Sequence, residues 1–144
     1  MRSLVLVSFF AAATAFSGLS AALAADVTYK ATLDGKSETP PTGSTGAGSL
    51  TAQFDPATKT LTWTITYSGL TGPAIAAHFH GPAPVGKPAG VLVPIKSALD
   101  SPIQGSATLT DEQAKALEDG LIYFNIHTAA NKPGEIRGQL EKAM

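Results

Sequence analysis

The chain has 144 residues, with 10 Lys and Arg against 11 Asp and Glu, three His and no Cys. This length suits one domain once a leader is removed. The near-balanced charge leaves no basic stripe for a nucleic acid or an anionic membrane, and the lack of cysteine excludes disulfides and thiolate chemistry.

Residues 1–25 have the organisation of an export signal peptide. Arg2 supplies a positive start, an apolar run follows, and Ala-Leu-Ala at 22–24 offers a small-residue cleavage site. A membrane anchor would need about 20 uninterrupted apolar residues, whereas Gly18 and its serine neighbours break this run. We therefore expect a periplasmic or secreted protein with no membrane span after cleavage, in which residues 26–144 form a single domain.

The predicted domain begins with segments whose apolar and polar residues alternate, which is the period of a half-buried β-strand. Residues 27–33 alternate in this way, and a polar loop over 36–48 leads to a second alternating set that ends at Phe54. The most regular run is 60–67, where Thr side chains face one side and apolar side chains face the other. This regularity predicts an antiparallel sheet with one buried side, and Trp63 belongs to that side.

The next predicted strand, residues 74–80, ends in a His-x-His pair. Because residues i and i+2 of a strand share a face, His78 and His80 point one way. The opposite face is expected to carry Ile75, Ala77 and Phe79. A Pro-rich loop then leads to a short strand over 91–95, which Pro94 places at a sheet edge.

The C-terminal part combines strands with one short helix. Residues 104–109 form a strand, and residues 110–113, Thr-Asp-Glu-Gln, have the form of a helix capping box. We therefore expect one short helix near 111–119. Two further strands cover 121–127 and 135–141. The polar face of the first of these carries Tyr123, Asn125 and His127.

Seven or eight short strands with one short helix predict an all-β fold. We expect an antiparallel β-sandwich, immunoglobulin-like or Greek key, whose core holds the apolar faces of these strands. The residues expected in that core are Leu61, Trp63, Ile65, Phe79, Phe124, Ile126, Ile136 and Leu140.

All three histidines of the chain lie near the ends of two predicted strands. Three neutral imidazoles can hold Zn²⁺ with a fourth position left for water, or Cu²⁺ with open positions. We therefore interpret His78, His80 and His127 as candidate ligands of Cu or Zn. The alternative is that these rings line a polar sheet face or hydrogen-bond to loop carbonyls.

Three other polar residues are candidates for orienting an imidazole without contacting the metal themselves. Asn125 shares a strand face with His127, and Glu135 and Arg137 lie close to it through the turn at 131–134. The alternative for Glu135 and Arg137 is a surface ion pair worth well under ~1 kcal/mol. Nucleophile-elbow, phosphate-loop and metalloprotease helix motifs are absent from the sequence, so no catalytic residue is assigned.

Two segments resemble the CHRD domain, which is named for chordin. They are Ala-His-Phe-His-Gly-Pro-Ala at 77–83, and Tyr-Phe-Asn-Ile-His-Thr at 123–128 with Gly-Glu-Ile-Arg-Gly-Gln-Leu at 134–140. Earlier residues fit the same pattern: Gly35, Glu38, Pro40 and Pro41. The resemblance implies a β-rich extracellular module that also occurs as a stand-alone exported protein in bacteria. It implies no catalytic activity for this chain. The chain has none of chordin's cysteine-rich domains, so chordin's developmental role is not implied.

The His-x-His strand is also similar to the copper strand of copper/zinc superoxide dismutases. That chemistry uses a zinc aspartate and more histidines than the three present here, so dismutase activity of that type is not expected.

The leading hypothesis is an exported CHRD-domain protein that binds Cu or Zn through three histidines, for binding or handling rather than turnover. The alternative is a structural or adhesion module without a metal, whose partner is a protein or a cell surface. A third hypothesis is a three-histidine metalloenzyme that acts through a metal-bound water.

Overall fold

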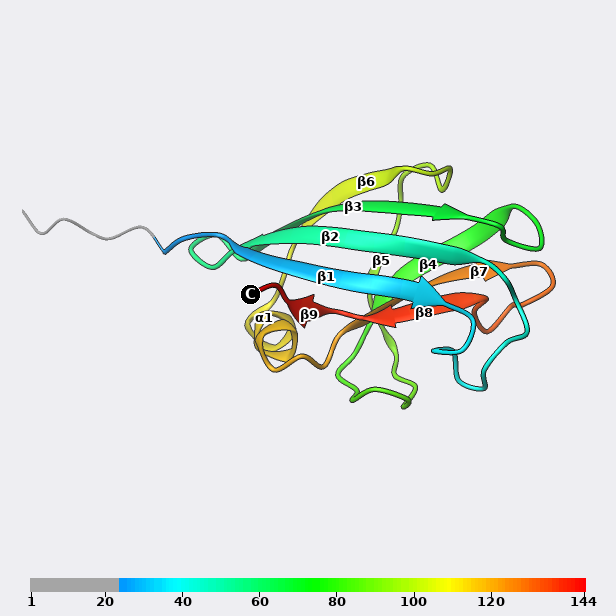
Figure 1. Ribbon diagram of the computed structural model, residues 1–144. Coiled ribbons are helices and arrows are strands. Elements are labelled where there is room, and N and C mark those ends of the chain that lie inside the picture. The colour runs from blue at the N-terminus through cyan, green and yellow to red at the C-terminus, as the bar shows by residue number, and fades with distance from the viewer. Residues whose placement is uncertain (1–23) are drawn as a thin grey trace, which may run out of the picture.

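The computed structural model describes residues 24–144, so the predicted signal peptide, residues 1–25, lies almost wholly outside the described residues. The described chain forms nine strands and one helix (Figure 1). In chain order they are β1 (Val27–Asp34), β2 (Ala47–Asp55), β3 (Thr60–Ser68), β4 (Ala74–His80), β5 (Val91–Pro94), β6 (Ile103–Thr108), α1 (Asp111–Glu118), β7 (Tyr123–Thr128), β8 (Ile136–Gln139) and β9 (Glu141–Lys142).

The strands pair in the order β5-β4-β7-β8-β1-β2-β3-β6, with β9 beside β1, and these strand pairs are antiparallel. This sheet curls over, so that β1, β2, β3 and β6 lie opposite β4, β5, β7 and β8 (Figure 1). The predicted all-β antiparallel fold is confirmed. Its two layers are the halves of one nearly closed, barrel-like sheet. The edge position predicted from Pro94 is also confirmed, since β5 ends the order.

The core fills the space between the two halves of the sheet. All eight residues predicted for it are buried, each with 5% or less of its surface exposed. Trp63 on β3 meets Phe79 on β4 with ring centroids 5.0 Å apart, and Phe79 meets Phe124 on β7 at 4.9 Å. This aromatic chain therefore joins one half of the sheet to the other.

Ile75 departs from the predicted alternation. Ala77 and Phe79 are buried as expected, but Ile75 is 54% exposed. The β4–β7 register shifts between Ala74 and Ala76, and such a bulge re-aims the side chain beside it. The expectation that Ile75 faces the core was therefore wrong.

Helix α1 confirms the helix predicted near 111–119. The Gln113 amide donates to Thr110 Oγ1 at 3.2 Å, and the Thr110 amide donates to Gln113 Oε1 at 3.0 Å, which completes the capping box. The helix lies at one end of the sheet (Figure 1) and buries Ala114, Ala116 and Leu117.

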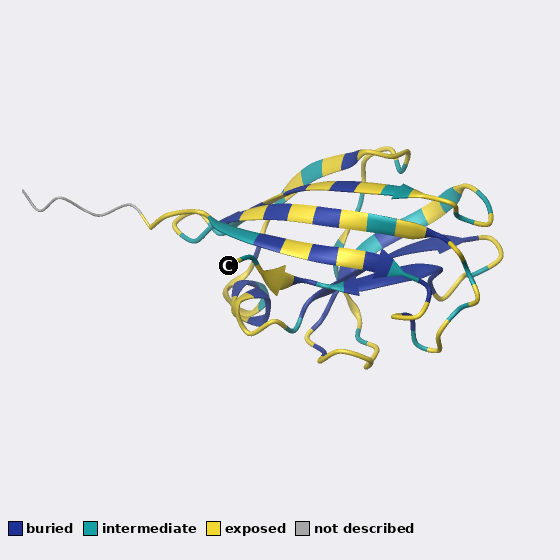
Figure 2. Cartoon of the chain, in the orientation of Figure 1, coloured by how far each residue is buried: buried dark blue, intermediate teal, exposed yellow. Residues whose placement is uncertain are grey.

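Burial differs between the two halves of the sheet (Figure 2). Strands β1, β2 and β3 alternate between buried and exposed residues, as their sequence predicts. All six residues of β7 are buried. Loop 35–46 contacts this region through the Glu38–Asn125 hydrogen bond, and loop 81–90 contacts it through Ala89 and Tyr123. The polar face of β7 therefore lies beneath two loops.

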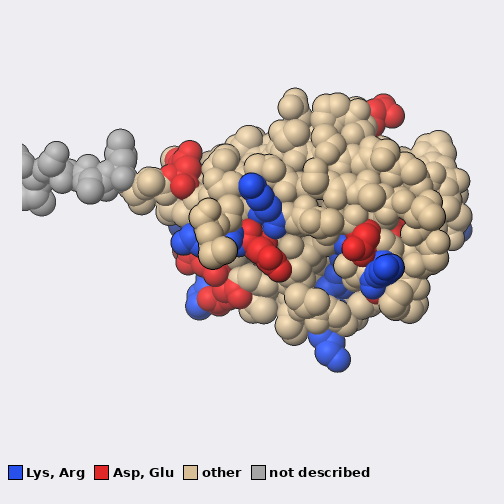
Figure 3. All heavy atoms as spheres, in the orientation of Figure 1, with Lys and Arg blue, Asp and Glu red and all other residues tan. Residues whose placement is uncertain are grey.

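Charged residues of both signs are interspersed on the face shown in Figure 3. Within residues 24–144, no helix has the length and apolar character needed to cross a membrane.

Candidate metal centre

The three histidines come together on two neighbouring strands. β4 and β7 are antiparallel, with His78 opposite Asn125 and Ala76 opposite His127. Since Ala77 and Phe79 point into the core, strand alternation turns His78 and His80 to the other face. A single site for all three histidines requires these two strands to lie side by side, and β4 and β7 do.

The ring nitrogens of the trio are close to one another. His78 Nδ1 and His127 Nε2 are 3.0 Å apart, and one nitrogen from each of the three rings lies within 4.8 Å of the others. Nitrogens bound to a common Zn²⁺ at about 2.0–2.1 Å are at most about 4.2 Å apart. The separation of up to 4.8 Å exceeds this limit, so the three rings would have to move closer together to bind a single ion.

His127 is held by the turn that follows its own strand. Its Nδ1 lies 2.8 Å from the Lys132 carbonyl oxygen, and a carbonyl can only accept. The proton is therefore on Nδ1, and the lone pair is on Nε2, toward His78. Metal-binding histidines commonly donate their second ring nitrogen in this way.

Both ring nitrogens of His80 face hydrogen-bonding partners. Its Nδ1 lies 3.0 Å from the Ala89 carbonyl oxygen, and its Nε2 lies 3.0 Å from Asn125 Oδ1. The ring stacks on Tyr123, with centroids 4.8 Å apart and planes 4° from parallel. These contacts fix the ring plane and leave 8% of the residue exposed.

Asn125, predicted to support an imidazole, does contact one. While Oδ1 meets His80, Nδ2 donates to Glu38 Oε1 at 3.3 Å and to the Pro133 carbonyl at 3.4 Å. Gly134 makes this arrangement possible, because a Cβ there would lie 2.6 Å from Asn125 Nδ2 and would also meet the Glu38 carboxylate. Its φ of +142° is likewise a conformation that favours glycine.

The environment favours neutral imidazoles. Burial lowers the pKa of His78 below its ordinary value, and the neighbouring His127 and His80 lower it further. Burial also lowers the pKa of His80, although its hydrogen bonds to Ala89 and Asn125 act in the opposite direction. Neutral imidazole is the form that binds a metal.

Glu135 and Arg137 lie near the site, but their hydrogen bonds go elsewhere. The Glu135 carboxylate accepts from Ser44, Thr71 and Thr128 at 2.5–2.8 Å. The Arg137 guanidinium donates to Thr39 Oγ1 and to the Lys87 carbonyl, and it lies 3.4 Å from the centroid of the Tyr123 ring. Both residues are buried, so neither belongs to a surface ion pair. Arg137 and His80 each contact the ring of Tyr123.

Comparison of the chain with known protein families assigns it to one family. The CHRD domain matches residues 29–140, which is most of the chain. The chain belongs to the CHRD domain family. No curated protein and no solved structure matches it.

The CHRD match spans both histidine strands, and it confirms the resemblance drawn from the residues around His78, His80 and His127. The all-β fold observed here agrees with the β-rich module that the resemblance to CHRD domains implies.

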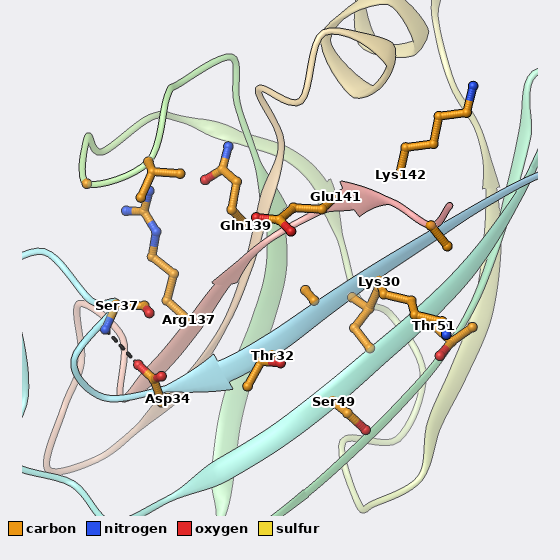
Figure 4. A pocket seen from close by; sticks show the side chains of 15 residues that line it. Lys30, Thr32, Asp34, Ser37, Ser49, Thr51, Arg137, Gln139, Glu141 and Lys142 are labelled. Carbon is orange, nitrogen blue, oxygen red and sulfur yellow. Dashed lines mark hydrogen bonds between the residues drawn. The ribbon is translucent and has the colours of Figure 1, made fainter.

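The CHRD domain also has a polar groove of about 610 Å³ on another part of its surface (Figure 4). Outward-facing residues of β1 and β2 line it, and Val85 and Gly86 of loop 81–90 stand beside it. Its lining includes none of the three histidines, but it does include Arg137. Arg137 therefore contacts both the groove and Tyr123, the ring that stacks on His80.

Sequence reasoning missed several groups that orient the histidines. Tyr123 shares the polar face of β7, so the same alternation that selected Asn125 and His127 could have selected it. Glu38 is distant in sequence, and only the fold brings it to Asn125. The carbonyls of Ala89 and Lys132 leave no sequence signal, because every residue has a carbonyl.

Proposed function

We propose that this CHRD-domain protein is exported and binds a divalent transition metal, Cu²⁺ or Zn²⁺, through His78, His80 and His127. The observation that carries the proposal is the convergence of three ring nitrogens within 4.8 Å on adjacent strands. The Lys132 carbonyl supports it, because it holds His127 with the lone pair turned toward His78. Imidazole is a suitable ligand for both ions.

Metal binding or handling is favoured over turnover. A bound divalent ion would supply Lewis acidity, but the surrounding residues are hydrogen-bonded to one another and to backbone rather than poised as an acid–base pair. Asn125 and Glu38 contact each other, while Tyr123 exchanges hydrogen bonds with the backbone of Ala89. This arrangement stabilises ring positions and is typical of a holding site.

A metal titration of the untagged protein tests the proposal. Wild-type protein should bind one equivalent of Cu²⁺ or Zn²⁺ at micromolar concentration, measured by calorimetry and by metal analysis after gel filtration. Replacing any one of His78, His80 or His127 with alanine should weaken binding strongly. Asn131→Ala, in the neighbouring turn, is the matched control and should bind as the wild type does.

Failure of the wild type to bind either ion would contradict the proposal. That result would favour the structural or adhesion module, for which the polar groove offers a surface to a protein or cell-surface partner.

Export rests on the charged start, apolar run and small-residue site of the first 25 residues. Protein recovered from the periplasm or the medium should begin at Ala25 or Asp26 on N-terminal sequencing. An intact Met1 on exported protein would contradict this part of the proposal.

A further inference from the structure

The two ring nitrogens of His80 face two oxygen atoms. Nδ1 is 3.0 Å from the Ala89 carbonyl oxygen, and Nε2 is 3.0 Å from Asn125 Oδ1. A neutral imidazole has one N–H, so it can donate to only one of them. One contact therefore sets a nitrogen lone pair against an oxygen.

Rotation of the Asn125 amide does not resolve this conflict. Its Nδ2 donates to Glu38 Oε1 and to the Pro133 carbonyl oxygen. Exchanging Oδ1 and Nδ2 would turn the amide oxygen toward these two acceptors and lose both bonds. Asn125 is 3% exposed, so water does not compensate. Its oxygen is therefore held toward the histidines.

The position of Asn125 matches that of a ligand. It lies directly opposite His78 in the β4–β7 ladder and two residues before His127 on the same strand face. His80, two residues from His78, lies opposite Tyr123, and His127 lies opposite Ala76, so the four side chains occupy three successive levels of one face of the ladder. Three of them offer ring nitrogens, and Asn125 offers the amide oxygen.

We propose that Asn125 Oδ1 is the fourth ligand of the metal, so that the site is a closed set of three nitrogens and one oxygen. This inference rests on the proposed function. In the loaded protein, His80 donates from Nδ1 to Ala89, and its Nε2 lone pair and Asn125 Oδ1 face the same cation. The contact that lacks a proton is thereby replaced by two bonds to the metal.

A closed site has a functional consequence. Structural zinc sites have four protein ligands, whereas catalytic sites keep one position for water or substrate. With Asn125 in that position, the site holds its ion without activating a water. The inference thus distinguishes metal handling from the three-histidine metalloenzyme.

Co²⁺, a spectroscopic substitute for Zn²⁺, provides the test. The visible spectrum of Co²⁺-loaded wild-type protein should not change when azide is added, because no position is open to an anion. In Asn125→Ala the spectrum should shift saturably with azide, and Zn²⁺ affinity should fall by at least the roughly 10–100-fold that loss of an outer-shell partner costs. Asn125→Asp should keep the spectrum insensitive to azide and bind Zn²⁺ at least as tightly as the wild type. Asn131→Ala is the control and should behave as the wild type does.

The possible results are distinguishable from one another. If the wild type binds neither Co²⁺ nor Zn²⁺, the proposed function itself fails. If it binds them and azide shifts the wild-type spectrum, the site is open and the assignment of Asn125 as a ligand is overturned. A residue that only positioned His80 would change affinity on substitution, with the same azide response in wild type and variant. If Asn125→Ala fails to fold, the azide response of the wild type still shows whether the fourth position of the metal is open or closed.

Discussion

The side chains of His78 and His80 differ from free imidazole in how readily they accept a proton. Burial is the main cause of the lowered pKa in both residues, and the neighbouring rings add to it. Protons therefore compete with a metal less effectively at these two positions than at an exposed histidine. The fold thus prepares these two rings as ligands.

An NMR titration of the metal-free protein checks these two pKa values. The imidazole C–H signals of His78 and His80 should titrate with midpoints below 6.5, the ordinary value, because burial disfavours the charged ring. The same signals in urea-unfolded protein are the reference and should titrate near ~6.5. Midpoints in the folded protein at or above the unfolded ones would show that the rings are not desolvated.

The charge of Glu135 makes the stability of the fold depend on pH. Burial raises the pKa of its carboxyl group, but hydrogen bonds from Ser44, Thr128 and Thr71 outweigh this and lower it from 4.5 to about 2. The folded protein therefore releases the proton more readily than the unfolded chain does. The stabilisation is fully present above pH ~4.5 and is lost as pH falls toward about 2.

Glu135→Gln should lower the free energy of unfolding at pH 7 by about 1–3 kcal/mol, because donors aimed at a carboxylate lose their charged acceptor. Urea denaturation at several pH values measures this. The difference between wild type and variant should shrink as pH falls from 4.5 toward 2. Glu141→Gln, on the exposed strand β9, is the control and should have little effect. A difference that stays constant with pH would contradict the assignment to Glu135.

At the scale of elements, the turn between β7 and β8 contributes both to the stability of the fold and to the geometry of the candidate metal site. Gly134 lies so close to the side chains of Glu38 and Asn125 that a Cβ would clash with them. Its backbone also has a positive φ of 142°. Gly134→Ala should lower the free energy of unfolding by about 1–3 kcal/mol through backbone strain. It should also weaken Zn²⁺ binding, because the new methyl group displaces the amide that contacts His80.

Thermal denaturation and a Zn²⁺ titration measure the two effects. Gly72→Ala is the matched control, since a Cβ there meets nothing within 4 Å, and it should change neither stability nor affinity. Equal behaviour of the two variants would show that the close approach at Gly134 does not support the site.

The faces of the strands were predictable from sequence, whereas their pairing was not. The period of two predicts which face of a strand each residue occupies, and it correctly assigned Trp63, Phe79 and Phe124 to one core. It failed at Ile75, beside the register shift of β4, and it did not predict the burial of the polar face of β7. It also put His78 and His80 on the face opposite Phe79. It does not specify that β4 and β7 are neighbours, which depends on contacts between segments about 50 residues apart.

The parts of the site that lie outside alternating strands were not predictable from sequence. Loop 35–46 brings Glu38 to Asn125, and loop 81–90 brings the Ala89 carbonyl to His80; loop conformation has no simple sequence period. Glu135 and Arg137 were selected for their nearness to His127 in sequence. Their partners Ser44, Thr39 and Lys87 come from those same loops, so only the fold shows where the two charged groups point.

At the scale of the whole molecule, stability depends on how well the curled sheet closes on its core. Trp63 and Phe79 form a contact between opposite halves, with ring centroids 5.0 Å apart. Trp63 Nε1 is buried without a hydrogen-bond partner among the described residues. The ring therefore contributes packing, while its N–H opposes folding.

These two contributions can be separated by two substitutions of Trp63. Trp63→Ala should lower the free energy of unfolding by about 3–5 kcal/mol, because it leaves a cavity between the two halves of the sheet. Trp63→Phe keeps a ring against Phe79 and removes a buried donor whose desolvation costs about 1–3 kcal/mol. The loss of volume is thereby partly offset, and this variant should lose less than about 1.5 kcal/mol. Urea denaturation followed by circular dichroism suits the comparison, since both variants lack the only tryptophan of the chain. If Trp63→Phe cost as much as Trp63→Ala, the indole N–H would have to be making a favourable interaction rather than an unfavourable one.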